Sequence, residues 1–142
     1  MKKLLILLLG VGLLPSVAPA HNLGEKYLAG NRVTVALSKD FVNNERALAR
    51  NFVKHKGVER LYRNLVRHFK EYRIRRSLKV DVLITEFYSG PGRERLMADV
   101  IVTERGEPLD NFIVEETTAL HPKIRRLTRG LSKRITKRAR MM

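Results

Sequence analysis

The sequence predicts an α+β domain in which an antiparallel-rich, four-stranded sheet is covered on one face by two amphipathic helices, in the order β-α-β-β-β-α. Apolar residues recur at three- and four-residue steps over 44–74 and 122–139, which is the period of an α-helix. Four other segments alternate between apolar and polar residues and are rich in β-branched side chains: 31–37, 78–88, 95–104 and 109–117. A helix layer packed on one sheet face would bury both kinds of apolar surface.

The first predicted strand, 31–37, has apolar residues at its odd-numbered positions from 33 onward. Asn43 or Asn44 is expected to cap the long helix that follows, because an asparagine side chain accepts hydrogen bonds from the free amides of a first helical turn. Gly57 falls in a gap of the apolar spacing of this helix. The sequence therefore allows a kink or a break into two helices at that point.

Turn residues at 89–92 and 105–108 join the last three predicted strands into two hairpins. Pairing Phe87 with Met97 across the first hairpin places Leu83 opposite Ile101 and predicts a wholly apolar face for the helices to cover. That face consists of Leu78, Val80, Val82, Ile84, Leu96, Ala98, Val100 and Val102. Pro122 suits the first turn of the closing helix, which is expected to run to about residue 139.

The other face of the predicted sheet is too apolar to be a fully hydrated surface. It carries Leu83, Phe87, Met97, Ile101 and Ile113. Two interpretations stay open: this open face is an interface for a partner or for a second copy of the chain, or the segment 23–28 folds over it.

Residues 1–20 have the three parts of a secretory signal. Lys2 and Lys3 give a positive start, an apolar run of about 11 residues follows, and a small-residue APA box ends at Ala20. The run is shorter than the roughly 20 apolar residues that cross a bilayer. We expect a periplasmic or secreted protein cleaved after Ala20, with residues 21–142 as a single domain; an uncleaved anchor is the alternative.

The chain is strongly basic, with 29 Lys and Arg against 14 Asp and Glu and a formal charge of +15. Removing the signal takes away two lysines and leaves +13. A field of this sign attracts polyanions. For an exported protein these are anionic envelope components, namely lipid head groups, lipopolysaccharide or acidic glycans, or an acidic protein; export argues against nucleic acid. No cysteine is present, which excludes disulfides, thiolate metal sites and a lipidated cysteine.

Basic residues are concentrated on both predicted helices, and no acid follows Lys123. The predicted anion-binding set is Arg60, Arg63, Arg67, Arg125, Arg126, Arg129, Lys133, Arg134 and Lys137. A run of charge is often only a solvated helix face, and this alternative stays open.

The sequence contains no recognisable catalytic or cofactor motif. Its four histidines show no spacing typical of metal ligands. Asp81 and Asp99 share a sheet face, but no histidine or nucleophile is placed to join them. We therefore expect a non-enzymatic protein without a metal or cofactor. An accessory envelope subunit that docks by its open sheet face is the alternative, and a glycan hydrolase, for which no acid pair is placed, is third.

The carboxy-terminal half combines LKVDVLITEF, a Gly-rich turn, LMADVIVTE, GEPLDNFIV and a closing helix. This combination resembles small, uncharacterised cell-envelope domains of bacteria, mostly lipoproteins, whose fold is similar to the amino-terminal domain of TolB. The resemblance covers residues 31–139 as a pattern of elements and 78–118 as local sequence. It implies a non-enzymatic module of an envelope assembly.

Overall fold

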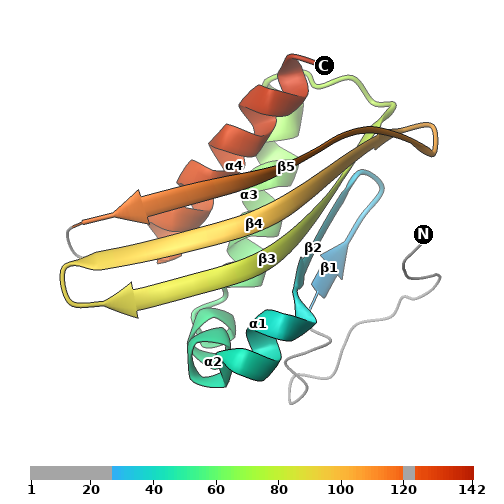
Figure 1. Cartoon of the computed structure of the whole chain (residues 1–142). Helices are drawn as coiled ribbons and strands as arrows, with labels where there is room; N and C mark the ends of the chain where they lie inside the picture. Colours follow the sequence, from blue (N-terminus) through green and yellow to red (C-terminus); the bar gives the residue numbers. More distant parts are fainter. Residues whose placement is uncertain (1–26, 120–123) are drawn as a thin grey trace.

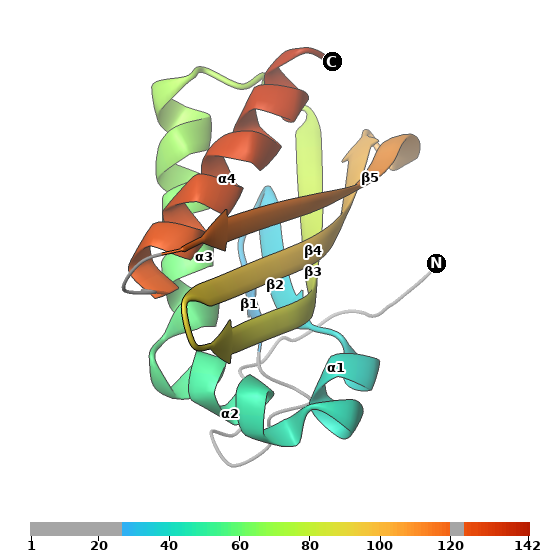
Figure 2. The same cartoon turned by 60° about the vertical axis from the view of Figure 1, so that its left-hand side comes forward.

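The computed structural model describes residues 27–119 and 124–142. Along the chain these form β1 Tyr27–Ala29, β2 Val33–Leu37, α1 Lys39–Asn44, α2 Arg46–Lys54, α3 Gly57–Glu71, β3 Leu78–Gly90, β4 Arg93–Glu104, β5 Glu107–Thr118 and α4 Ile124–Arg140. The strands form one sheet in the order β1-β2-β3-β4-β5, and α3 and α4 lie side by side on one of its faces (Figures 1 and 2). Helices α1 and α2 lie at one end of this two-layer arrangement (Figure 2). The predicted secretory signal lies outside the described residues.

The predicted α+β class is confirmed, but the sheet differs from the predicted one. Within the described residues it has five strands, because β1 pairs antiparallel with β2 as an edge strand of three residues. Such a short strand has too little alternation to be seen in a sequence. Strand β2 runs parallel to β3, so the sheet is mixed. A parallel pair needs a long crossover connection, and α1 to α3 provide it.

The helix predicted over 44–74 is present as two helices, α2 and α3, and an additional helix that was not predicted, α1, precedes them. The structure has three helices in this part of the chain, and the first begins earlier than predicted. Ser38 caps it, since the Ser38 Oγ accepts a hydrogen bond from the Phe41 amide at 3.0 Å. Asn43 and Asn44 close this helix and do not cap the next one.

The break between α2 and α3 lies next to Gly57, where the gap in the spacing of apolar residues allowed a kink or a break. Lys56 adopts a left-handed conformation with φ 61°, and α3 begins at the next residue, Gly57. A Cβ atom at Gly57 would meet the Phe52 ring at 2.4 Å. The close approach of a buried ring therefore requires glycine at this corner.

The predicted register between β3 and β4 was wrong by two residues, because Leu83 pairs with Asp99 and not with Ile101. Because successive side chains of a strand point to opposite faces of the sheet, a register shift of two residues leaves every side chain on its predicted face. The register then shifts once more at a bulge between Ile84 and Glu86. An added residue changes the face of everything beyond it, so Phe87 points into the core.

The helix-covered face of the sheet is the predicted one. All eight residues expected on it, the even-numbered positions 78–84 and 96–102, are buried. Phe52, Leu61, Leu65 and Phe69 from α2 and α3 pack against them as predicted, and Leu127 and Leu131 come from α4. Within residues 27–119 and 124–142, no helix is both long and apolar enough to cross a membrane.

Candidate functional site

The predicted anion-binding residues lie on a layer made by two neighbouring helices. α3 and α4 lie side by side, with their carboxy-terminal ends at the same end of the molecule (Figure 1). Between them, His68 Nδ1 and Ser132 Oγ are 2.7 Å apart in a buried hydrogen bond. Near the helix ends, the Arg140 guanidinium lies 5.7 Å from the centre of the Tyr72 ring. These contacts fix which basic residues of the two helices face one another.

The charges of three basic residues, from both helices, act on the buried His68. Burial lowers the pKa of His68, and the charges of Arg67 on α3 and of Lys133 and Arg129 on α4 lower it further, while Glu71 opposes them. A cation lowers the pKa of a histidine only when it lies close enough to disfavour the imidazolium. Arg67 precedes His68 directly, Lys133 follows Ser132 directly, and Arg129 lies about one helical turn before Ser132, so these three residues, called the seam cations below, belong to the turns of α3 and α4 that meet at the His68–Ser132 contact.

The seam cations are poorly neutralised by the protein. Arg67 and Glu71 approach to 3.9 Å in a solvent-exposed pair one helical turn apart, a geometry that contributes little. Within the described parts of the chain, no carboxylate forms an ion pair with Arg129 or Lys133, and both side chains are exposed. The lack of acids on α4 leaves this surface with positive charge available to a ligand.

The opposite flank of α4, which faces β5, is different. The Arg134 Nε lies 2.5 Å from the Glu116 Oε1, and Arg138 Nη2 lies 3.1 Å from Asp110 Oδ2. Arg138 also stacks over the Phe112 ring, with its guanidinium carbon 4.4 Å from the ring centre. Arg134 and Arg138, the β5-side cations, thus have partners in the protein.

The other predicted anion-binding residues are placed as follows. Arg63 on α3 is exposed, and so are Arg125, Arg126 and Lys137 on α4. Arg60 is half-buried and donates from its Nε to the His55 carbonyl oxygen at 3.3 Å. The structure thus brings most of the predicted set onto one helix layer, apart from Arg134, which turns to β5; that the set binds an anion stays a prediction.

The open sheet face keeps part of its predicted apolar character. Leu83 is 40% exposed, Ile101 41% and Ile113 69%, and Met97 is half-buried on the same face. Phe87 is fully buried because of the β3 bulge, and its ring lies 5.2 Å from that of Phe52. Placing Phe87 on this interface was therefore wrong.

Two carboxylates interrupt the apolar residues of the open face. Asp99 lies between Leu83 and Ile113 across the sheet, and Asp81 pairs with Ile101. Desolvation raises the pKa of Asp81 above its ordinary value, although the Thr34 hydroxyl and Lys79 oppose this shift. These pairings replace the predicted ones of Asp81 with Thr103 and Asp99 with Thr85.

The segment 23–28, the alternative cover for the open face, is described only at its end. Leu28 belongs to β1, pairs with Val35 and packs against the helix-covered core. Leu28 therefore does not cover the open face, and residues 23–26 lie outside the described part of the chain.

The interhelical pair of His68 and Ser132 was missed by the sequence reasoning. One signal was present, because His68 follows Leu61 and Leu65 at the spacing of the buried helix face. Among the described residues, no group of three or more His, Asp or Glu side chains could hold a metal ion.

Comparison with known proteins adds little to this site. No known family matches the sequence, and no curated protein matches it. A crystal structure of a "putative lipoprotein" from Caulobacter crescentus CB15 is similar with a TM-score of 0.42 and 12% identity, over 60% of this chain and 81% of that one. A likeness at this level carries no argument about the present chain, and the resemblance to the amino-terminal domain of TolB stays a prediction.

Proposed function

We propose that this chain is an exported, non-enzymatic envelope protein that binds an anionic envelope component through the outer surface of α3 and α4. The observation that carries the proposal is the group of seam cations, Arg67, Arg129 and Lys133, which lie together above His68. Arg126 and Lys137 extend the group on exposed positions of α4. Glu71 approaches Arg67 but leaves these like charges largely unbalanced, and an anionic ligand would reduce the repulsion among them.

The strength expected of such a surface is moderate. Each Lys or Arg close to an anionic lipid surface contributes about 1 kcal/mol of binding free energy. Four or five such residues would give a dissociation constant of about 0.2–1 mM. Screening by salt would weaken it, because the charges are exposed to solvent.

Binding to vesicles of phosphatidylglycerol and phosphatidylcholine, titrated with salt, tests this function. We expect Arg126→Glu, Arg129→Glu and Lys133→Glu, made together, to abolish most of the binding and to flatten its salt dependence. A heparin column run in parallel distinguishes an acidic glycan from a lipid surface as the ligand.

A matched control uses Arg46→Glu, Arg50→Glu and Lys54→Glu on α2. These residues are exposed, recur at steps of about one helical turn as the α4 residues do, and change the net charge by the same amount. The control is expected to keep most of the vesicle binding. Equal losses in both variants would show that only net charge matters, and the helix surface would then be a solvated face.

The second candidate is an accessory subunit that docks by its open sheet face. The exposure of Ile113 and Ile101, which is unusual for large aliphatic side chains on a sheet, favours it. Binding to an envelope partner that survives about 0.5 M salt and the α4 triple variant, but is lost in Ile101→Ser with Ile113→Ser, would support this candidate against the first.

A further inference from the structure

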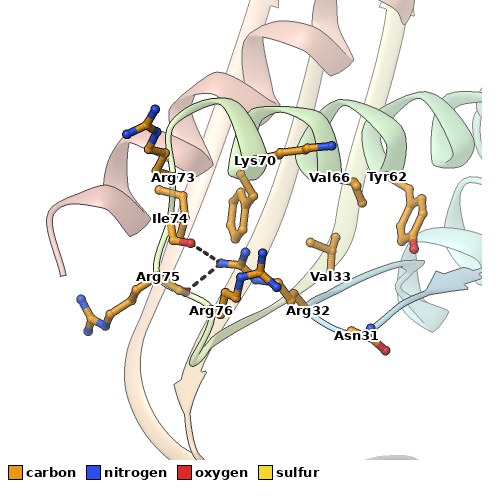
Figure 3. A pocket seen from close by; sticks show the side chains of 11 residues that line it. Asn31, Arg32, Val33, Tyr62, Val66, Lys70, Arg73, Ile74, Arg75 and Arg76 are labelled. Atoms are coloured by element: carbon orange, nitrogen blue, oxygen red, sulfur yellow. Dashed lines mark hydrogen bonds between the residues drawn. The ribbon is translucent and has the colours of Figure 1, made fainter.

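A groove on the other flank of α3, away from α4, gathers basic side chains from distant parts of the chain. It has a volume of about 610 Å³, and its basic lining residues are Arg32, Lys70, Arg73, Arg75 and Arg76. None of the described residues that line it is acidic. Arg32 and Arg76 lie next to each other, Lys70 extends along the rim, and Arg73 and Arg75 point away (Figure 3). Arg32 and Arg76 therefore lie together in the groove, and Lys70 lines its rim.

Arg32 is held in a fixed position in the groove. Its Nη2 donates to the carbonyl oxygens of Ile74 at 2.9 Å and Arg75 at 2.8 Å, and its guanidinium lies 5.3 Å from the centre of the Phe69 ring. The Arg32 Nε is buried and has no acceptor among the described residues. A buried donor without an acceptor calls for a ligand, ion or water at this point.

The surroundings of Arg32 disfavour its own charge. Burial lowers the pKa of Arg32, and the neighbouring Arg76 lowers it further. Within residues 27–119 and 124–142, no carboxylate pairs with Arg32, Lys70 or Arg76. Arg75 is different, because its guanidinium pairs with Glu104 at 2.8 Å and lowers the pKa of that carboxyl to about 2. Arg75 is thus neutralised, whereas Arg32, Lys70 and Arg76 are not.

The carboxy-terminal end of α3 explains the presence of only some of the basic residues in the groove. Cations near the last turn of a helix compensate its dipole, which accounts for Lys70 and Arg73. Arg32 directly precedes β2, and Arg76 lies beyond α3. Arg73 itself occupies the left-handed position after the helix, with φ 53°, where glycine is the usual residue.

We propose that this groove binds a phosphate monoester, with the phosphate between Arg32, Arg76 and Lys70. A phosphate monoester carries a charge of about −1.5 to −2 at neutral pH and three acceptor oxygens, which matches several cations better than a carboxylate does. The groove also has apolar lining residues, Val33, Tyr62 and Val66, against which the organic part of the ligand packs. The site uses none of the seam cations and goes beyond the proposed function.

Calorimetry on the mature protein with glycerol 3-phosphate tests the proposal, with glycerol as the uncharged probe. We expect saturable binding of the phosphate compound alone. Lys70→Gln with Arg76→Gln should weaken it at least about tenfold, because each charge-assisted hydrogen bond to the phosphate is lost. Both residues are exposed, so this variant should fold. Arg32→Lys, which keeps the charge but loses the planar fork, should also weaken binding.

Arg63→Gln with Arg126→Gln is the matched control, since it removes two exposed charges of the helix layer outside the groove. It is expected to leave the affinity for glycerol 3-phosphate within about twofold. Absence of saturation up to about 10 mM, or an equal loss in control and groove variants, would overturn the site.

Vesicles distinguish the source of the phosphate. Phosphatidic acid carries a monoester and phosphatidylglycerol a diester, so a lipid ligand predicts a preference for phosphatidic acid that Lys70→Gln with Arg76→Gln removes. A soluble ligand predicts glycerol 3-phosphate binding without that preference. In either case Arg129→Gln with Lys133→Gln should spare glycerol 3-phosphate binding, so that failure of the seam surface and failure of the groove give different results.

Discussion

On the flank of α4 that faces β5, Arg134 and Arg138 pair with Glu116 and Asp110; on the flank that faces α3, Arg129 and Lys133 have no carboxylate partner among the described residues. Both flanks belong to one helix and carry the same kind of side chain. The difference comes from the neighbouring element, because β5 presents acids to α4 and α3 presents Arg67. A basic helix thus offers charge to a ligand only where the fold has not already neutralised it.

The largest effect on stability is expected from the buried apolar side chains of α4, which hold the helix, and therefore both of its flanks, in place. Leu131 is fully buried under α4. Leu131→Ala should lower the free energy of unfolding by about 2–5 kcal/mol through the cavity it leaves. Urea unfolding followed by circular dichroism measures this loss. An unchanged midpoint would mean that α4 does not pack on the sheet, and the comparison of its flanks would lose its basis.

The second effect is a pH dependence of stability that arises from His68. The pKa of His68 is lowered by burial and further by Lys133 and Arg129 on one flank of α4, whereas Arg134 and Arg138 are not among the causes. The pKa of His68 is lowered in the folded protein, so the unfolded chain binds more protons below its own histidine pKa of about 6.5. Stability should therefore be complete above that pH and fall as the pH falls below it. Melting temperatures between about pH 7.5 and 5 should show this loss in the wild type, and less of it in His68→Gln.

Titration of His68 by NMR separates the flanks. Arg129→Gln with Lys133→Gln should raise the pKa of His68, since both cations disfavour its protonation. Arg134→Gln with Arg138→Gln should leave it unchanged. The same shift in both variants would contradict the placement of the seam cations.

A smaller effect is expected from neutralising the paired flank. Arg134→Gln and Arg138→Gln should each cost about 0.2–1 kcal/mol of stability, because each breaks a partly exposed ion pair. Arg129→Gln and Lys133→Gln should cost nothing measurable in a thermal melt or should stabilise the protein slightly. A larger loss of stability in Arg129→Gln or Lys133→Gln would show that the substituted residue has a stabilising partner in the folded protein.

The smallest effect is expected at Gly130. A Cβ atom there would meet the end of the Glu116 side chain at 2.5 Å, and that flexible end can move. Gly130→Ala gains about 1 kcal/mol of helix propensity but disturbs the Arg134–Glu116 pair, so we expect a net change below about 1 kcal/mol in urea unfolding. A large loss would show that Glu116 is rigidly held by its surroundings.

Much of this fold could be predicted from the sequence, because the spacing of apolar residues along a helix or strand indicates which of its faces is buried. The buried face of Val82 and Val100 and the helix face of Leu65 were predicted from those patterns and confirmed. The edge strand β1 and the bulge that buries Phe87 were not predicted. Both depend on pairing with a neighbour that is distant in the sequence, which local pattern does not encode.

The candidate site, like the fold, could be predicted only in part. The abundance of basic residues on both helices is a sequence property, whereas their partners are a property of the fold. That Arg134 would meet Glu116, and that Arg129 would have no carboxylate partner among the described residues, depends on the position of α4 between α3 and β5. The groove around Arg32 had one sequence signal, the RIRR run at 73–76, but its other half comes from a residue more than 40 positions earlier.

Vesicle binding of two double variants with equal net charge tests most directly whether the unpaired flank of α4 is the binding surface. Arg129→Gln with Lys133→Gln should lose about 2 kcal/mol of binding free energy to phosphatidylglycerol vesicles at low salt, roughly thirtyfold, with a flatter salt dependence. Arg134→Gln with Arg138→Gln should lose far less, because these cations are held by Glu116 and Asp110. Equal losses in the two variants, or a greater loss on the β5 side, would contradict the assignment.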